Sequence, residues 1–489
     1  MEEFAQSREC FAELEEWLSG GQAAALTHVE LEEQLGARGR ELLRQLHQDH
    51  LDLRAAREQR REKVTGADGV ARTRAEHGHR RGLVTVFGEV TVTRMAYRAP
   101  GAANLHPADA ALNLPEEKHS HGLRKLAAIE SARGSFESAA QAITRATGAV
   151  IGKRQTEELA RRAAADINAF YAARRPGPAP DDQLLVLTFD GKGIVMRPEA
   201  LRPATARAAA SARRKLATRL SPGEKHGRKR MAELAAVYDA IPATRTPGDI
   251  IRLPKQDGSA RRPGPAAADK WLTASVTEDI AAVIAAGFGE AERRDPGHRR
   301  TWVALVDGNT IQIDAITAEA KRRHVAVHIV CDFIHVLEYL WKAAWSFFEP
   351  GDPSAEDWVA AQAVKILEGK ATQVAAGIRR RASTFGYAGA EREGADACAG
   401  YLTAKKPWLD YATALARGWP VATGVIEGAC RHLVKDRMDI TGARWGLDGA
   451  EAILKLRSLI ASGDFGEYWP FHLRQEHQRV HRSRYDLAA

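Results

Sequence analysis

Cysteine is scarce in this sequence, and the few cysteines are scattered. Cys10, Cys331, Cys398 and Cys430 form no C-x-x-C pair among the 489 residues. This spacing argues against a disulfide framework and favours a reducing compartment, so we expect a cytoplasmic protein.

Long apolar runs are absent as well. No stretch approaches the roughly 18 apolar residues that a membrane-spanning helix requires. The acidic start MEEFAQSRECFAELEE is unlike a signal peptide. We therefore expect no membrane partner.

Charge of one sign does not dominate the composition. The 71 lysines and arginines outnumber the 63 acidic residues, which gives a net charge of +8 and an isoelectric point near 9.3. A moderately basic balance makes nucleic acid a candidate partner. The length of 489 residues predicts two or more domains.

The N-terminal part predicts a mainly helical region that contains a β-hairpin. Residues 1–66 carry a narrow leucine stripe among charges of both signs, a pattern typical of long helices that pack on a partner, and dimerisation is expected here. Residues 67–118 change to a period of two around Gly88 and Glu89. This period is typical of a tight hairpin.

Residues 119–175 return to helical spacing, in segments near 121–133, 135–148 and 153–171. The short turn GAVIG between the last two predicts a helix-turn-helix DNA-binding domain, in which Arg154, Arg161 and Arg162 are candidate DNA contacts. An ordinary three-helix packing unit fits this segment equally well. Prolines and a glycine mark residues 176–183 as a linker.

Residues 184–350 predict the first part of an α/β core. Strands are expected at 184–190, 231–239, 249–253, 301–307 and 325–332, with helices at 269–287, at 311–323 and after residue 332. The order of three strands, helix, strand, helix, strand and helix is that of an RNase H-like fold with a mixed five-stranded sheet. An all-α insertion is expected at 351–420, and residues 421–489 add a last core helix and a C-terminal tail.

Two of the predicted strands end in an aspartate that is followed by glycine. Asp190 lies in TFDGKG and Asp307 in LVDGN. A single Asp-Gly pair is commonly a turn. Acids at the ends of the first and fourth strands, however, would lie at the sheet edge where ligands bind. Because the fourth strand is expected beside the first, Asp190 and Asp307 should face each other, with Asp332 further out.

A third acid lies in the predicted helix GVIEGACRHLVKDRM. Glu427 is flanked by Gly424 and Gly428, and a glycine inside a helix costs about 1 kcal/mol relative to alanine. The glycines therefore indicate close approach of another backbone or of a ligand. Arg431 and Lys435 follow at spacings of four residues and are expected on the same face, although such a Glu–Arg pair is also an ordinary surface ion pair.

Carboxylates from several elements suit phosphodiester cleavage and transfer. Two Mg²⁺ ions about 3.5–4 Å apart can activate the attacking oxygen and stabilise the leaving one. Mg²⁺ prefers hard oxygen ligands, and Mn²⁺ is expected to substitute for it. Glu427 would then be the third carboxylate of such a site.

The sequence resembles the DDE transposases of bacterial insertion sequences, most closely the ISKra family. The resemblance covers most of the chain and rests on TVFGEVTVTRMAYR, LHPADAALNLP, FDGKG, VDGN, CDFIHVLEYLW, GVIEGACRHLVKDRM and TGARW. It implies that Asp190, Asp307 and Glu427 are the catalytic and metal-binding acids. None of the three positions departs from the family pattern, which favours an active enzyme.

Further candidate DNA contacts are basic or aromatic residues of the core. They are Arg213, Arg214 and Lys215 in the run 197–230, Arg431 and Lys435 after the glutamate, and Arg444 and Trp445 in TGARW. The run holds eleven lysines and arginines against two glutamates. Such a run is most often a solvated face, but its place beside the predicted site favours contact with DNA phosphates.

Asp332 and His335 are expected to act behind the metal ligands. Asp332 would support the site or cap the following helix rather than bind metal directly. Zinc is not favoured, because neither Cys331 with His335 nor Cys430 with His432 has an established zinc-finger spacing.

Together these features predict a DNA transposase that binds terminal inverted repeats and target DNA as a homodimer or higher oligomer. Two alternatives stay open. One is a catalytically inactive, transposase-derived DNA-binding regulator, and the other is a structure-selective nuclease of the same fold.

Overall fold

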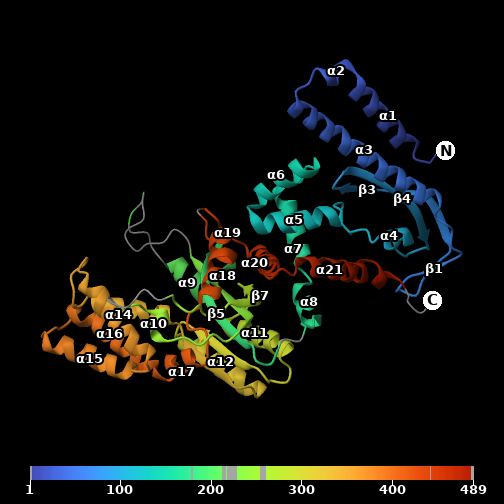
Figure 1. Cartoon of the computed structure of the whole chain (residues 1–489). Coiled ribbons are helices and arrows are strands. Elements are labelled where there is room, and N and C mark those ends of the chain that lie inside the picture. Colours follow the sequence, from blue (N-terminus) through green and yellow to red (C-terminus); the bar gives the residue numbers. More distant parts are fainter. Residues whose placement is uncertain are drawn as a thin grey trace. The chain divides into compact units, whose positions relative to one another are not determined.

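The chain divides into two compact units. The computed structural model describes residues 3–177, 180–211, 216, 218, 228–253, 260–440 and 442–485. Unit 1 comprises Met1–Ala173 and Gly463–Ala489, and unit 2 comprises Arg174–Ser462 (Figure 1). The sequence analysis grouped 421–489 with the core, but the chain leaves unit 2 after Ser462 and its last helix belongs to unit 1.

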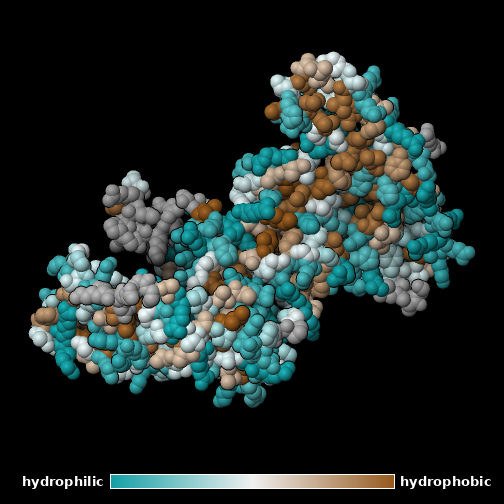
Figure 2. All heavy atoms as spheres, viewed as in Figure 1, coloured by the Kyte–Doolittle hydropathy of each residue, from teal (hydrophilic) through white to brown (hydrophobic). Residues whose placement is uncertain are grey.

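Unit 1 begins with a layer of helices, α1 (Ala5–Ser19), α2 (Gly21–Ala24) and α3 (His28–Ala56). One element that packs against α3 is α1, and the backbone N–H of Ser7 donates to Asp49 there at 2.9 Å. Leu35 and Leu46 of the predicted stripe are each 39% exposed. Figure 2 shows apolar residues gathered on the visible face of this layer. Dimerisation through residues 1–66 stays a prediction.

A pair of long antiparallel strands packs under α3. β3 (Arg74–Thr85) and β4 (Gly88–Arg98) meet with Thr85 opposite Gly88 across a two-residue connection. Val90 and Val92 of β4 are buried with Leu51 of α3. The shorter strands β1 (Val64–Thr65) and β2 (Ala71–Arg72) form a second antiparallel pair, and α4 (Pro107–Ala111) follows.

Two of the three helices predicted in residues 119–175 begin and end close to the predicted positions. α5 (His121–Arg133) is followed by α6 (Phe136–Thr147), which is capped by Ser135 and ends at Gly148 in the left-handed conformation. The third predicted helix divides, because α7 (Lys153–Ala163) ends before α8 (Ile167–Ala173) begins. A cluster of buried side chains holds α5, α6 and α7 together: Leu123, Ala127, Ile143, Ala149, Ile151 and Leu159.

A buried polar network joins the C-terminal helix α21 (Phe465–Val480) to this bundle. Arg124 of α5 is fully buried and donates to Glu476 at 3.0 Å and to Glu117. The buried His472 lies 2.7 Å from Asp166, which follows α7. α21 is therefore an integral element of unit 1, and the short helix η4 (Arg482–Arg484) ends the described chain.

Unit 2 contains a mixed five-stranded sheet in the order β7-β6-β5-β8-β9. β5 (Leu184–Val195) pairs antiparallel with β6 (Lys229–Ala240) and parallel with β8 (Thr301–Val306). β6 pairs antiparallel with β7 (Ala267–Ser275), and β8 pairs parallel with β9 (Val327–Cys331). The predicted mixed sheet, with the fourth strand beside the first, is confirmed.

The third strand was predicted wrongly. The segment 249–253 lies partly in the short helix α10 (Pro247–Ile250), and the third strand is β7, at 267–275. The predicted helix at 269–287 is accordingly wrong in its first part. β7 occupies that part, and α11 (Ile280–Arg294) begins after the N-cap Asp279. Pairing of Trp271 with Val237 on β6 overrides the alanine-rich composition.

Helices cover both faces of the sheet. An added Cβ at Gly287 of α11 would lie 2.9 Å from the Phe189 ring, so α11 packs directly on the face to which Phe189 points. The side chain of Asp190 points to the opposite face, because side chains alternate along a strand. It meets Cys430 there, so the segment that carries Glu427 covers this second face.

The remaining helices of unit 2 flank the sheet. The segment 351–420, predicted as an all-α insertion, is helical (Figure 1): α14 and α16 pack against α13, and α15 packs against α14 and α16. No helix in the described ranges combines the length and apolar character needed to cross a bilayer. The bounds are η1 (Pro198–Ala200), α9 (Pro203–Ser211), α12 (Thr310–Arg323), α13 (Phe333–Ala344), α14 (Ser354–Leu367), α15 (Ala371–Thr384), α16 (Ala390–Ala404), η2 (Lys406–Trp408), α17 (Tyr411–Ala416), α18 (Gly424–Ala429), η3 (Cys430–Lys435), α19 (Asp436–Met438) and α20 (Leu447–Ala461).

Candidate active site

Asp190 and Asp307 occupy matching positions on neighbouring parallel strands. The β5–β8 pairing ends with Thr188 opposite Leu305, and each aspartate lies two residues further on. β5 does not end at Asp190, as the sequence suggested, but continues along β6 to Val195. Asp190 therefore lies where β8 has already ended, and its side chain borders the carboxyl edge of the parallel part of the sheet.

The carboxylate of Asp190 is held by a backbone N–H and by a thiol. Oδ1 accepts from the Gly191 N–H at 2.6 Å, and Oδ2 accepts from Cys430 Sγ at 3.1 Å. Burial, together with the negative charge of Asp190, raises the pKa of Cys430 well above its ordinary value. The thiol is therefore protonated at neutral pH and acts as the donor.

Asp307 lies at the turn between β8 and α12. Its Oδ1 accepts from the Asn309 N–H at 2.7 Å, and its carbonyl oxygen accepts from the Tyr401 hydroxyl at 3.3 Å. Gly308 has φ of +92°, and an added Cβ there would lie 2.8 Å from the Tyr401 hydroxyl oxygen. Both constraints require glycine at 308, so α16 of the insertion fixes the turn that carries Asp307.

Glu427 lies in the first turn of α18 and is exposed to solvent. Its Oε1 lies 3.2 Å from the hydroxyl of Thr423, which also donates to Oδ2 of Asp332. Asp332 is fully buried and caps α13, with Oδ1 accepting from the Ile334 N–H at 2.9 Å. The capping role predicted for Asp332 is confirmed. Its burial and its two donors leave it poorly placed to bind metal directly.

His335 lies one turn along α13 and is half-buried. Its Nδ1 is 3.1 Å from Oε2 of Glu338. Burial opposes the charged imidazole, but the hydrogen bond to Glu338 and the charges of Asp332 and Asp307 outweigh it and raise the pKa of His335. These surroundings therefore stabilise the charged form of His335 relative to an imidazole in water.

The three candidate acids suit a divalent cation in their chemistry. Within the described part of the chain, the side-chain donors to Asp190 and Glu427 are a neutral thiol and a neutral hydroxyl, with no lysine or arginine among them. Carboxylate oxygens are ligands that Mg²⁺ prefers. No three His, Cys, Asp or Glu side chains among the described residues are grouped closely enough to hold a metal ion. Asp190, Asp307 and Glu427 therefore do not form an assembled metal site in the described structure.

The helix that carries Glu427 is not one continuous α-helix. α18 changes at Cys430 into the π-helical segment η3, and α19 follows. Arg431 and Lys435 are both exposed. Because a π-helical turn contains more residues than an α-helical turn, a spacing of four residues does not by itself place them on the same face as Glu427. An added Cβ at Gly424 or Gly428 would meet no protein atom within 4 Å. Among the described residues, no close approach of protein atoms therefore requires glycine at either position.

The remaining candidate DNA contacts of unit 2 have different environments. Arg444 is exposed. Trp445 is only 6% exposed, and its Nε1–H donates to the Met438 carbonyl at 3.0 Å, while the Arg437 guanidinium lies 4.7 Å from its ring centre. Trp445 thus packs inside unit 2, contrary to the expected DNA contact. The other basic candidates lie outside the described residues: Arg213, Arg214 and Lys215.

In unit 1 the three candidate arginines of α7 differ in their ion pairs with acidic side chains. Arg154 is exposed. Arg161 pairs with Glu158 at 3.3 Å, and Arg162 pairs with Glu117 at 2.8 Å and with Glu158 at 3.2 Å. Arg154 is therefore the most available of the three for a phosphate or a base.

The sequence analysis missed three residues that position the candidate acids: Thr423, Cys430 and Tyr401. The spacing of four residues between Thr423 and Glu427 could have indicated the first. Cys430 is brought to Asp190 by η3, and Tyr401 approaches Asp307 from the insertion, 94 residues along the chain. Neither contact leaves a local signal in the sequence.

Comparison with protein-family models and with curated proteins finds no match for this chain. The family resemblance of its motifs therefore stays a prediction.

Proposed function

We propose that the protein is a DNA transposase of the DDE class. In this proposal it binds the terminal inverted repeats of its element as a homodimer or higher oligomer, cleaves a phosphodiester there, and joins the freed 3′ hydroxyl to target DNA. One observation carries the proposal: Asp190 and Asp307 lie at matching positions of neighbouring parallel strands, and Glu427 is linked through Thr423 to Asp332 at the end of the next strand.

The sheet supports the same conclusion. The order β7-β6-β5-β8-β9, with three antiparallel strands followed by two parallel ones, is the order expected of an RNase H-like core. Ligands of α/β sheets bind at the carboxyl ends of parallel strands. In this protein, that edge carries Asp190, Asp307 and the buried Asp332.

The protein side chains have distinct roles in this proposal. Asp190, Asp307 and Glu427 would hold two Mg²⁺ ions, which supply activation of the attacking oxygen and stabilisation of the leaving oxygen. Thr423 orients Glu427, and the Gly191 N–H and the Cys430 thiol orient Asp190.

DNA binding is assigned mainly to unit 1. α6 and α7 are joined by a short turn and form a compact bundle with α5, and Arg154 on α7 is exposed. Around the catalytic edge, Arg431, Lys435 and Arg444 are exposed and positively charged, as contacts to the cleaved strand require.

The proposal is tested with the full chain, a labelled duplex that contains the element end, and Mg²⁺. We expect a nick at the element boundary that leaves a 3′ hydroxyl, followed by joined product when a plasmid target is added. The Asp314→Asn variant, which alters an exposed acid on α12, is the matched control and should behave as wild type.

Two outcomes would overturn the proposal. Specific end binding without any nick in Mg²⁺ or Mn²⁺ would indicate a DNA-binding regulator. Nicking without end preference and without joined product would indicate a nuclease.

A further inference from the structure

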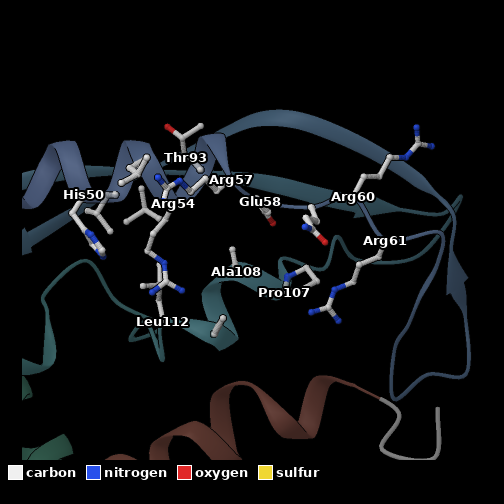
Figure 3. Close-up of a pocket in the computed structure, with 16 residues that line it drawn as sticks. His50, Arg54, Arg57, Glu58, Arg60, Arg61, Thr93, Pro107, Ala108 and Leu112 are labelled. Atoms are coloured by element: carbon white, nitrogen blue, oxygen red, sulfur yellow. The ribbon is translucent and has the colours of Figure 1, made fainter. Parts of the chain in front are cut away.

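A basic cavity lies in unit 1, and no residue of the helix-turn-helix candidate lines it. It has a volume of about 520 Å³ and lies between the C-terminal end of α3, β4 and α4 (Figure 3). Its lining includes apolar side chains, such as Leu51 and Val92, and polar side chains along the chain segment 50–61. The cationic side chains of this lining are those of Arg54, Arg57, Arg60 and Arg61.

Some of the charges at this cavity already have protein partners. Arg57 pairs with Glu3 at 2.5 Å. The carboxylate of Glu58 accepts from the Met95 N–H at 2.8 Å. Neither Arg57 nor Glu58 therefore sets the electrostatic potential inside the cavity.

Arg54 and Arg61 are the arginines that remain for a ligand. No carboxylate pairs with either of them among the described residues of unit 1. The backbone of Arg61 is fixed by its N–H, which donates to the Tyr97 hydroxyl at 2.7 Å. Figure 3 shows both side chains directed to the side of the cavity where α4 lies, with Pro107 and Ala108 between their ends.

Positive charge continues beyond the cavity. Arg60 points away from it in Figure 3. On the neighbouring strand, the exposed Arg80 stands opposite Thr93, which lines the cavity. Arg60 does not point into the cavity and Arg80 is not part of its lining, so both charges lie where a small anion inside the cavity has no contact with them but a longer polyanion extending out of it could. The arrangement therefore suits a linear polyanion better than a compact one.

We infer that the basic cavity and its rim form a groove that binds the sugar-phosphate backbone of double-stranded DNA. The inference rests on the proposed function, because it assigns a DNA surface to a protein proposed to act on DNA. Arginine contacts to phosphates release condensed counterions, so each contact contributes to affinity and to its salt dependence but not to sequence discrimination. The groove would hold DNA while the helices of α5–α7 select the sequence.

The test compares full-length variants for binding to an end duplex and to a random duplex over a range of salt. Arg54→Gln with Arg61→Gln should weaken binding to both duplexes about tenfold and lower the salt slope by about 2, since each phosphate contact contributes about 0.9. Arg74→Gln with Arg482→Gln removes the same charge from exposed positions of unit 1 outside α5–α7 and should leave the slope unchanged.

A charge-preserving variant separates binding from folding. Arg54→Lys with Arg61→Lys should keep most of the slope, because lysine also neutralises a phosphate. Adding Arg80→Gln to the double glutamine variant should lower the slope by about one more.

Each contrary result has a distinct meaning. If the wild type binds and nicks end DNA but the double glutamine variant keeps its affinity and slope, the groove inference fails and the proposed function stands. Tight binding of inorganic triphosphate at this groove, with DNA binding unaffected, would also overturn it in favour of a small ligand. A wild type that binds no DNA at low salt would overturn both.

Discussion

The hydroxyl of Thr423 lies between two carboxylates, those of Asp332 and Glu427. A threonine hydroxyl has one proton to donate. The shorter contact is to the buried Asp332, so this carboxylate is the main acceptor of a bifurcated hydrogen bond, and Glu427, 3.2 Å away, accepts its weaker branch. The Thr423 hydroxyl thus positions Glu427 without neutralising its negative charge, so this charge remains available to bind a cation.

Replacing Thr423 by valine should reduce nicking of end DNA without abolishing it. Valine keeps the shape but leaves Asp332 without a donor and Glu427 without its orienting contact. Loss of a group that orients a metal ligand typically costs about 10–100-fold. Thr423→Ser, which retains the hydroxyl, should recover most of the activity. Equal activity of the valine and serine variants would contradict this role.

Asp190→Ala and Glu427→Ala should each abolish cleavage while end binding stays near the wild-type level. Carboxylates attract metal ions and repel DNA, so their removal affects chemistry rather than affinity. Single-turnover nicking and a gel-shift titration measure the two quantities separately, with Asp314→Asn as the control. Persistent Mg²⁺-dependent nicking by either alanine variant would refute the assignment of these acids.

Asp307→Asn should abolish nicking of end DNA, whereas Asp332→Asn should only reduce it. The amide at 307 cannot help to neutralise two cations, so nicking should be lost. Asparagine at 332 can still cap α13, since Asn and Asp are comparable N-caps, and measurable nicking should remain. Mn²⁺ should partly restore the second variant. The opposite order of activities would show that Asp332, not Asp307, is the second catalytic acid.

Arg124→Met should strongly destabilise unit 1. The guanidinium is fully buried and pairs with Glu117 and Glu476, so its loss leaves two carboxylates without their main partner. Breaking a buried pair in this way costs about 3–5 kcal/mol. Arg133→Met, which removes an arginine that is 72% exposed, should cost less than about 1 kcal/mol. Urea unfolding followed by circular dichroism compares the two.

Unit 1 should lose stability in acid as Asp166 is protonated. Burial opposes its negative charge, but hydrogen bonds from His472 and Arg479 outweigh burial and lower the pKa of Asp166 to about 2. The folded value lies below the unfolded value of about 3.9. The stabilisation is therefore complete above about pH 4 and is lost as the pH falls toward about 2. Urea unfolding of Asp166→Asn at several pH values should show lower stability at pH 5 and a flatter decline in acid.

The strands that carry the candidate acids could be predicted from the sequence because their local signals are strong. The runs before Asp190 and Asp307 are continuous and apolar, as strands buried on both faces require. The third strand lacked such a signal. Its residues AADKWLTAS are rich in alanine and run into a helical segment, and only pairing with β6 makes them a strand.

Other features depend on contacts that the linear sequence does not display. The π-helical segment that brings Cys430 to Asp190 has no local signature in this sequence. The burial of Trp445 results from its position under Arg437 and against Met438, whereas the motif alone suggested a DNA contact. The membership of α21 in unit 1 depends on the buried Arg124, which the sequence presents as an ordinary charged helix residue.

The return of α21 to unit 1 affects the order in which the protein can be completed during synthesis. α8 leaves the ribosome roughly 300 residues before α21. At about 5–20 residues per second, this interval lasts roughly 15–60 s. Arg124 has no Glu476 to bind during that time. A stop codon anywhere within Arg174–Ser462 therefore yields a product in which neither unit is whole, so truncated chains would not release a functional N-terminal unit to compete with full-length protein.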